Sequence, residues 1–253
     1  MSPTPLIYAR SLAFNIAFFC WAMLSAILFS PLFLISSRAS LKAGHPWAMG
    51  SLWLVRIICG IKYEIRGRQY LREGSAIYAS KHQSAWDTII FLTLMRHPAY
   101  VLKRELLRIP LWGWYLWRMK MIAIDRSAGG AGLKDMLRQS KSALADGRNI
   151  VIFPEGTRIK VGAQSHYHPG IVAMYSQCKV PVVPVALNSG CFWGRNAFLK
   201  RPGKIVMEFL PPIPPGQPKD QFLTQLQHTI ETATNRLVAE ANAASRKNGQ
   251  ENR

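Results

Sequence analysis

The chain has few cysteines, and their spacing argues against two kinds of site. There are four among 253 residues, Cys20, Cys59, Cys178 and Cys191, with no C-x-x-C pair. Structural zinc sites and disulfide frameworks need closely spaced or regularly paired cysteines, so neither is predicted and no metal site is expected. Isolated thiols in apolar stretches behave as small hydrophobic residues, which is consistent with a reducing cytosol.

Acidic residues are scarce as well. Thirteen Asp and Glu stand against 32 Lys and Arg, which leaves a formal net charge of +19. This excess predicts a polyanionic neighbour, which is nucleic acid, an anionic membrane surface or a phosphorylated substrate. No recognised nucleic-acid motif accompanies the charge, so no nucleic-acid partner is expected. The eight tryptophans and a long apolar N-terminus favour a membrane with anionic lipids.

The longest apolar run lies near the N-terminus. From Leu12 to Phe29 only Asn15 and Ser25 interrupt it. The run approaches the ~20 residues that cross a bilayer, and it exceeds the roughly 7–15 apolar residues of a signal peptide. Pro31 then predicts a kink or a re-entrant turn, because proline cannot continue the hydrogen bonding of a straight helix.

A second apolar segment, Trp47–Ile61, follows the turn signal Gly44-His45-Pro46. Arg38, Lys42 and the nearby tryptophans resemble interfacial anchors. We therefore expect residues 1–61 to form a membrane-anchoring helical pair. The excess of Lys and Arg after the first segment predicts that the remaining chain lies on the cytoplasmic side of the cell inner membrane.

Beyond residue 62 short β-rich runs alternate with helical stretches, which predicts an α/β domain over residues 62–245 with a mixed, largely parallel central sheet flanked by helices. A polar tail, frayed at its end, is expected over 246–253. The expected strands are Lys62–Arg66, Ser75–Ser80, Tyr100–Leu102, Met121–Ile124, Asn149–Phe153, Val182–Leu187 and Lys204–Phe209. The expected helices are Trp86–Met95, Gly132–Ala145, Gly170–Cys178 and Gln221–Ala244.

Three polar clusters follow expected strands, where functional residues of open α/β sheets gather. They are 81–87, Arg126 and 154–158. In the first, His82 and Asp87 are five residues apart, about 140° around a regular helix, so a turn must bring them together. If it does, the carboxylate orients one imidazole nitrogen and the other acts as a general base. The spacing alone also occurs by chance in ordinary polar pairs.

Four blocks of sequence resemble the 1-acylglycerol-3-phosphate acyltransferase family. The first is His82-Gln83-Ser84-Ala85-Trp86-Asp87, the HX4D motif. The others are Lys103–Leu106 with Pro110–Gly113 and Ile122–Arg126, then Phe153–Arg158, and finally Val180–Ala186. The blocks stand in family order and the resemblance covers roughly residues 60–215. It implies the glycerolipid acyltransferase fold, with a helical pair that embeds in the membrane as in the bacterial members.

The resemblance also implies an activity and its residues. His82 and Asp87 would be catalytic, activating the sn-2 hydroxyl of lysophosphatidic acid to give phosphatidic acid. Acyl-CoA or acyl carrier protein would donate the acyl group as a substrate, with no cofactor. The residues implied in substrate phosphate binding are Lys103, Arg126, Glu155, Gly156, Thr157 and Arg158. Guanidinium groups suit bidentate phosphate contacts. Glu155 would orient those cations or cap a helix.

Some positions keep open alternatives. The family often carries a lysine before Gly170, where this chain reads Tyr167-His168-Pro169. Trp114 and Trp117 share a helical face and either border an acyl-chain channel, enter the membrane interface or pack in the core. The glycine-rich stretch 127–132 is expected to be a flexible loop, since it matches no phosphate-binding pattern. The proline-rich stretch 211–218 is expected to be a stiff connector.

Three other functions compete with this one. The first is acyl transfer to another lysolipid, and the second is acyl transfer to glycerol 3-phosphate. Both would use the same His-Asp chemistry. In the third the chain is a basic membrane-binding protein without catalysis, whose cations recruit anionic lipid at about 1 kcal/mol per residue. Loss of transfer in His82→Ala with membrane binding retained would favour the enzyme.

Overall fold

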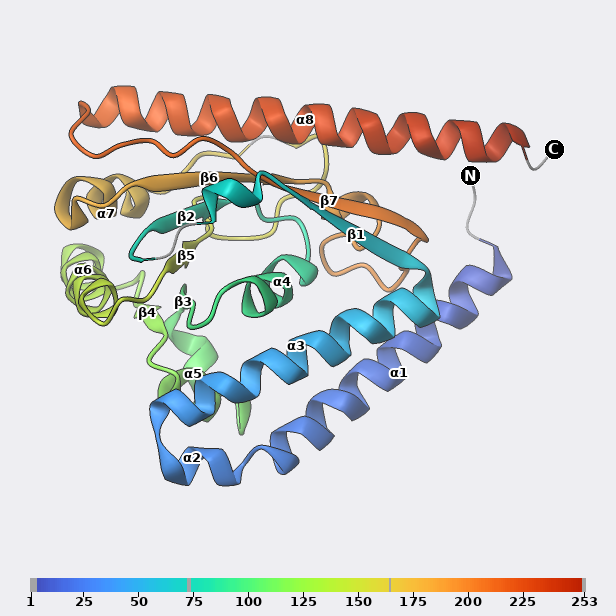
Figure 1. Cartoon of the computed structure of the whole chain (residues 1–253), viewed down its shortest axis with the longest axis horizontal. Coiled ribbons are helices and arrows are strands. Elements are labelled where there is room, and N and C mark those ends of the chain that lie inside the picture. Colours follow the sequence, from blue (N-terminus) through green and yellow to red (C-terminus); the bar gives the residue numbers. More distant parts are fainter. Residues whose placement is uncertain (1–3, 72–73, 164, 252–253) are drawn as a thin grey trace.

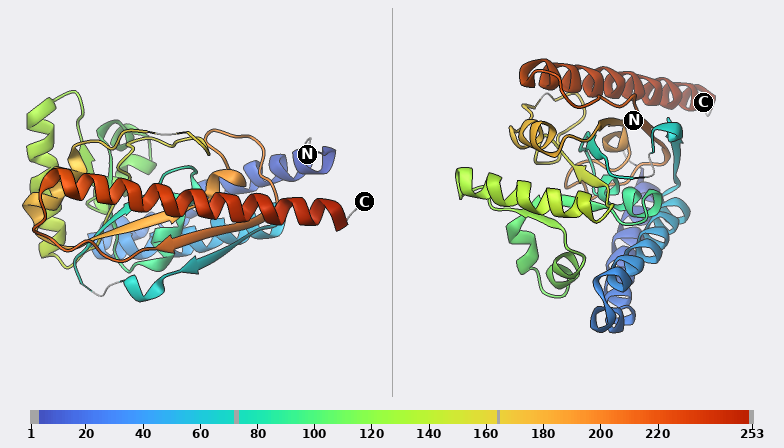
Figure 2. Two further views of the ribbon diagram at one scale, coloured as in Figure 1. Left: turned by 90° about the horizontal axis from the view of Figure 1, so that it is seen from above. Right: turned by 60° about the vertical axis from the view of Figure 1, so that its left-hand side comes forward.

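The computed structural model describes residues 4–71, 74–163 and 165–251. A mixed sheet of seven strands in those ranges lies between two groups of helices (Figure 1). Helices α1 (Pro5–Leu28), α2 (Pro31–Ile35) and α3 (Ser37–Cys59) lie on one side, and the long α8 (Lys219–Glu251) lies on the other (Figures 1 and 2).

The sheet has the order β1-β7-β6-β2-β5-β3-β4. Every pair of neighbouring strands is parallel except β6 and β7. This confirms the predicted fold class, and each predicted strand is present with ends that differ by at most two residues. The strands are β1 (Ile61–Arg66), β2 (Ile77–Ser80), β3 (Ala99–Lys103), β4 (Ile122–Ile124), β5 (Ile150–Ile152), β6 (Val182–Leu187) and β7 (Gly203–Phe209).

Helices connect the strands and cover both faces of the sheet. The α-helices are α4 (Trp86–Leu94), α5 (Trp112–Arg118), α6 (Gly129–Ala145) and α7 (Gly170–Cys178), and the short 3-10 helices are η1 (Arg68–Tyr70), η2 (Arg104–Arg108) and η3 (Ser189–Cys191). The four helices predicted after residue 62 are confirmed. Alternate strand residues face opposite ways: Tyr78 and Val183 join the core with α3 and α4, whereas Ile77 and Val182 join the core with α6, α7 and α8.

The predicted turn at Gly44-His45-Pro46 is wrong, because α3 continues through Pro46. Proline removes one backbone donor, and a helix tolerates that loss when tertiary contacts hold it. Here Trp21 Nε1 of α1 donates to Trp47 O at 2.9 Å. His45 Nδ1 lies 3.1 Å from Leu92 O of α4. By contrast, α1 ends at Leu28 and α2 starts at Pro31, which confirms the predicted break.

Two other expectations also fail. The stretch expected as a flexible loop is helical from Gly129, and Gly132 packs so closely that an added Cβ would lie 2.0 Å from Asp125 O. The small residue lets the first turn of α6 approach the segment that leaves β4. The part of the expected frayed tail that the structure describes, 246–251, is helical as the last turns of α8, and residues 252–253 lie outside the described residues.

Helix α1 has the dimensions of a membrane span. Among the described residues it is the one helix long and apolar enough to cross a membrane, and 22% of its apolar stretch is buried inside the protein. The second helix of the expected pair, α3, carries several charges but exposes one apolar face. Met49, Trp53 and Ile57 of that face recur every four residues with exposures of 47–62%.

Candidate active site

Four mutually parallel strands bring the predicted polar clusters to one edge of the sheet. Strands β2, β3, β4 and β5 run in the same direction, so their carboxyl ends meet there. His82 follows β2, Lys103 ends β3, Arg126 follows β4, and 154–158 follow β5. The structure therefore gathers the candidate residues around one place, as the sequence predicted.

The turn between β2 and α4 brings His82 and Asp87 into contact. Asp87 stands in the first turn of α4 and is fully buried. Its Oδ2 lies 3.0 Å from His82 Nδ1 and accepts the amide hydrogens of Gln83 at 2.7 Å and Ser84 at 2.8 Å. Three donors on one oxygen fix both the carboxylate and the turn. Nδ1 is thus the donor to Asp87, and Nε2 is left as the basic nitrogen.

Two serines complete the support for this pair. Ser84 Oγ accepts the amide hydrogen of Trp86 at 3.1 Å, just at the start of α4. Ser189 of η3 donates from Oγ to Asp87 Oδ1 at 2.5 Å and is fully buried. Ser189 was not predicted from the sequence, although it follows β6, a strand parallel to β2, and functional residues gather after such strands.

A buried ion cluster lies behind His82. Glu155 Oε2 accepts the amide hydrogen of His82 at 2.8 Å, and Glu155 Oε1 lies 2.6 Å from Lys81 Nζ. Lys81 also donates to both carboxylate oxygens of Glu231 on α8, at 2.7 and 2.8 Å. Tyr167 Oη donates to Glu231 Oε1 at 3.0 Å. Burial raises the pKa of Glu155, and the nearby Lys81 opposes that rise.

Glu155 therefore stands apart from the other residues implied in phosphate binding. It is 2% exposed, and its carboxylate points to the His82 amide and to Lys81 rather than into the cavity described below. It is a positioning residue for the histidine loop. The remaining candidates, Lys103, Arg126, Gly156, Thr157 and Arg158, all line that cavity.

Lys103, Arg126 and Arg158 form a cationic wall of the cavity, and the shape of this wall depends on a glycine. Arg126 Nη2 donates to Gly156 O at 3.0 Å. Gly156 has φ +64°, and a Cβ there would lie 2.6 Å from Arg126 Nη2 and 2.6 Å from His168 Cδ2. Only glycine combines this backbone conformation with such close neighbours. Among the described residues, Lys103 and Arg158 form no ion pair, so their charges are available to an anion.

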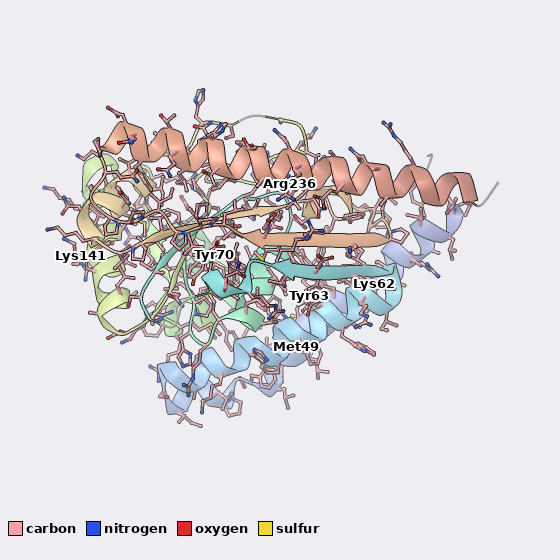
Figure 3. All side chains as sticks on the ribbon, turned by 45° about the horizontal axis from the view of Figure 1, so that its top comes forward. Met49, Lys62, Tyr63, Tyr70, Lys141 and Arg236 are labelled. Atoms are coloured by element: carbon pink, nitrogen blue, oxygen red, sulfur yellow. The ribbon has the colours of Figure 1, made fainter. Side chains whose placement is uncertain are left out.

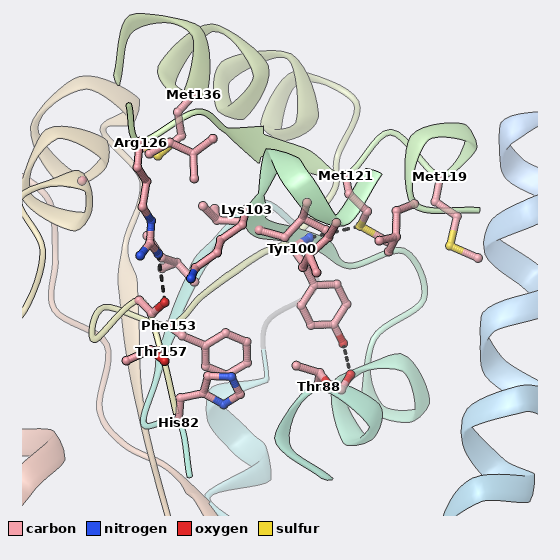
Figure 4. A pocket seen from close by; sticks show the side chains of 18 of the residues that line it. His82, Thr88, Tyr100, Lys103, Met119, Met121, Arg126, Met136, Phe153 and Thr157 are labelled. Atoms are coloured by element: carbon pink, nitrogen blue, oxygen red, sulfur yellow. Dashed lines mark hydrogen bonds between the residues drawn. The ribbon is translucent and has the colours of Figure 1, made fainter. Parts of the chain in front are cut away.

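One cavity of about 1060 Å³ joins these groups to the N-terminal helices. Figure 4 shows His82, Lys103, Arg126 and Thr157 around one end, with Met119 and Met121 towards the other. The His82 ring stacks on Phe153 with centroids 4.0 Å apart. The apolar part of the wall comes from α1 and the turn after it, and from α3, α4 and α5, through Ala26, Phe29, Gly44, Trp47, Leu92, Trp112 and Leu116.

The cavity also includes His168 and Arg195, which were not among the predicted site residues. His168 lies beside Gly156, at the place where the family often has a lysine. Arg195, which follows η3, lines the same cavity. Arg195 belongs to no recognisable motif, so only the folded chain reveals it, whereas the sequence already marks the position of His168 as a departure from the family. Within the described ranges, no three His, Cys, Asp or Glu side chains gather in a way that would hold a metal ion.

Fold and site together define an α/β enzyme with a buried histidine–carboxylate pair between a cationic wall and an apolar one. The family model described as Acyltransferase matches residues 62–188. A 1-acyl-sn-glycerol-3-phosphate acyltransferase from Pseudomonas aeruginosa is 34% identical over 222 residues, which are 88% of this chain and 86% of that protein. The chain belongs to this acyltransferase family and is an acyltransferase.

More distant relatives agree. A protein of the same name from Limnanthes douglasii is 32% identical over 63% of this chain and 57% of its own length. The crystal structure of the 1-acyl-sn-glycerophosphate acyltransferase from Thermotoga maritima superposes with a TM-score of 0.74 at 20% identity. It covers 91% of this chain and 97% of its own, and it supports the fold.

Proposed function

We propose that the enzyme transfers a fatty acyl group to the sn-2 hydroxyl of 1-acyl-glycerol-3-phosphate and so forms phosphatidic acid. The observation that carries the proposal is the position of His82, which lies in one cavity between an array of cations and a long apolar wall. A lysophosphatidate has the same arrangement, a phosphate next to a reactive hydroxyl and an acyl chain. The names of the relatives support this substrate.

In the proposed mechanism His82 is the general base. Its Nδ1 is held by Asp87, so Nε2 accepts the hydroxyl proton as the substrate oxygen attacks the thioester carbonyl. The new ester bond forms as the carbon–sulfur bond breaks, and the leaving thiolate takes the proton back from the imidazolium. Asp87 stabilises that imidazolium. General-base assistance contributes about 10²–10⁴-fold in rate, and alignment of the two substrates supplies much of the rest.

The phosphate would lie against Lys103, Arg126 and Arg158. Arginine provides paired donors for phosphate oxygens, and lysine provides a compact charge. Thr157 and the backbone at Gly156 lie at the same wall. Held there, the phosphate places the neighbouring glycerol hydroxyl near His82, while the acyl chain extends along the apolar wall towards α1 and α3.

The acyl donor is a thioester substrate, acyl-CoA or acyl carrier protein, and we propose no cofactor. We also propose that α1 and the exposed apolar face of α3 hold the enzyme on the cytoplasmic side of the cell inner membrane. Helix α1 is 24 residues long, about 36 Å at the rise of an α-helix, which exceeds a hydrocarbon core of about 30 Å. Its apolar composition suits a lipid environment.

An acylation assay with purified protein tests the proposal. Lysophosphatidate, another lysolipid and glycerol 3-phosphate are each offered with acyl-CoA and with acyl carrier protein. We expect lysophosphatidate to be the preferred acceptor, and His82→Ala to lower kcat by at least about 10²-fold. His228→Ala removes an exposed histidine from α8 and serves as the control, with activity unchanged. Preference for another acceptor would reject the substrate, and full activity of His82→Ala would reject the mechanism.

A further inference from the structure

An exposed apolar surface lies on η2, on α5 and on the turn between them. Its residues, which we call the α5 surface, are Leu106, Ile109, Leu111, Trp114 and Trp117, with exposures of 38–68%. Trp114 is 65% exposed and Trp117 68%. They are three residues apart on one helix and therefore lie on the same face. Contiguous exposed apolar side chains of this size mark a contact site.

The cavity does not explain the exposure of Trp114 and Trp117, although Leu106 and Ile109 of the same surface also line it. Its wall in the described chain includes Trp112 but neither Trp114 nor Trp117. Trp112 packs against Trp47 of α3 with ring centroids 5.0 Å apart and an interplanar angle of 69°. Helix α5 therefore turns one tryptophan towards the N-terminal helices and the cavity, and leaves the other two in solvent. Of the alternatives open in the sequence, the channel and the core do not apply to these two residues.

The α5 surface adjoins the apolar exterior of α1. Tyr115 Oη donates to Ala26 O at 2.6 Å, which fixes α5 against the end of α1. Around that contact α1 exposes Met23 at 54% and Ile27 at 64%. Figures 1 and 2 show α5 on the same side of the molecule as α2 and α3, opposite α8. The two apolar surfaces thus face the same environment.

The charges near the α5 surface point to an anionic neighbour. Beyond Lys103, which faces the cavity, residues 104–120 contain one acidic residue, Glu105, and four basic ones, Arg104, Arg108, Arg118 and Lys120. Tryptophan with flanking Lys and Arg is the composition found where proteins enter the headgroup region of a bilayer. Basic residues near an anionic leaflet add to the attraction.

We propose that the α5 surface is a second membrane contact, which inserts Trp114 and Trp117 into the interfacial region of an anionic bilayer beside α1. The inference rests on the membrane association in the proposed function and adds a separate site to it. It also gives the lipid a route. Ala26 of α1 and Phe29, the residue that follows this helix, form one wall of the cavity, and Leu106 and Ile109 form another. A lysolipid that enters between them passes from the bilayer to His82.

Tryptophan fluorescence of the full chain on vesicles tests the contact. The vesicles are phosphatidylglycerol with brominated acyl chains, which quench tryptophans near the hydrocarbon boundary. Trp114→Phe/Trp117→Phe removes two of the eight tryptophans and keeps the apolar character. We expect the double variant to lose mainly the quenchable part of the signal. If it loses mainly the unquenched part, the two tryptophans stand in water and the proposal is overturned.

Co-sedimentation separates this failure from failure of the proposed function. A chain that does not sediment with the vesicles overturns both the anchoring by α1 and the contact by α5. A chain that sediments while Trp114 and Trp117 stay unquenched overturns the α5 contact alone, and would leave that surface to a protein partner. Vesicles of neutral brominated phosphatidylcholine complete the test. We expect them to quench tryptophan fluorescence less, because a neutral surface does not attract the basic residues.

The kinetics of Trp114→Gln/Trp117→Gln test the route of entry. We expect the KM for lysophosphatidate in anionic vesicles to rise at least about fivefold, the equivalent of ~1 kcal/mol. For a short-chain lysophosphatidate dissolved as monomers we expect no change, because it needs no membrane contact. The Phe double variant is the matched control and should keep most of the activity. An equal rise in KM for the vesicle-bound and the monomeric substrate would show a structural defect and overturn the proposed route of entry.

Discussion

At the scale of single residues, the site depends on the backbone as much as on side chains. Asp87 holds His82 because the same carboxylate accepts the amide hydrogens of Gln83 and Ser84, which shapes the turn. The sequence predicted the need for such a turn from the five-residue spacing. Ser189 lies 102 residues away from Asp87, so a short motif could not reveal its hydrogen bond.

Gly156→Ala tests whether the position of Arg126 in the cationic wall requires a residue without a side chain at 156. A Cβ at φ +64° is strained and would displace Arg126 and His168, so we expect the KM for lysophosphatidate to rise about tenfold. Gly147→Ala is the matched control, because Gly147 has φ +72° with nothing within 4 Å. Both changes should cost about 1–2 kcal/mol of stability through the left-handed conformation. An unchanged KM in Gly156→Ala would show that Arg126 does not contact the phosphate.

At the scale of elements, α8 supports the active site through the Lys81 cluster. Lys81→Met would leave Glu155 buried without a cation, which typically costs about 3–5 kcal/mol. Glu231→Gln keeps the pair of Lys81 and Glu155, so we expect a smaller loss of about 1–2 kcal/mol. Chemical denaturation in detergent micelles measures both. A larger loss in Glu231→Gln than in Lys81→Met would contradict this order.

The edge strand β1 is joined to its neighbours by exposed ion pairs. Glu64 pairs with Arg66 at 2.7 Å and with Lys204 of β7 at 2.5 Å, and Arg66 reaches Glu240 of α8 at 2.9 Å. Figure 3 shows this region, where Tyr63 marks β1 and Arg236 marks α8. Hydrogen bonds from Arg66 and then Lys204 lower the pKa of Glu64 to about 2.

A stability profile against pH tests these pairs. Because the folded pKa of Glu64 is below its ordinary value, its contribution is present above pH ~4.5 and is lost as the pH falls towards about 2. Glu64→Gln should therefore be less stable than the parent at neutral pH and equal to it near pH 2. The difference should be below about 1 kcal/mol, because the groups are exposed. A constant difference across this range would reject the explanation.

At the scale of the whole molecule, the cavity unites segments that are far apart in sequence. Gly44 of α3 lines it, and a Cβ there would lie 3.4 Å from Leu92 of α4 and 3.6 Å from Met119. Gly44→Phe should fill the apolar part and leave His82 untouched. We expect the ratio of kcat/KM for palmitoyl over octanoyl substrates to fall about tenfold, equivalent to ~1.4 kcal/mol.

The control for Gly44→Phe is Met49→Phe. Met49 lies on the same helix, but it is 47% exposed and does not line the cavity. Its chain-length preference should equal that of the parent. If Gly44→Phe leaves the chain-length preference unchanged, the acyl chains bind outside this part of the cavity.

The sequence by itself determined the strands, the mixed sheet and the family, because alternating apolar runs and four short blocks are local patterns. The positions of His82, Arg126 and Arg158 after parallel strands also predicted that these three side chains share one edge of the sheet. Only the tertiary structure decided that α3 continues through Pro46, that Glu155 faces the His82 amide, and that Ser189, His168 and Arg195 belong to the site. These features depend on contacts between distant segments, and no local pattern encodes such contacts.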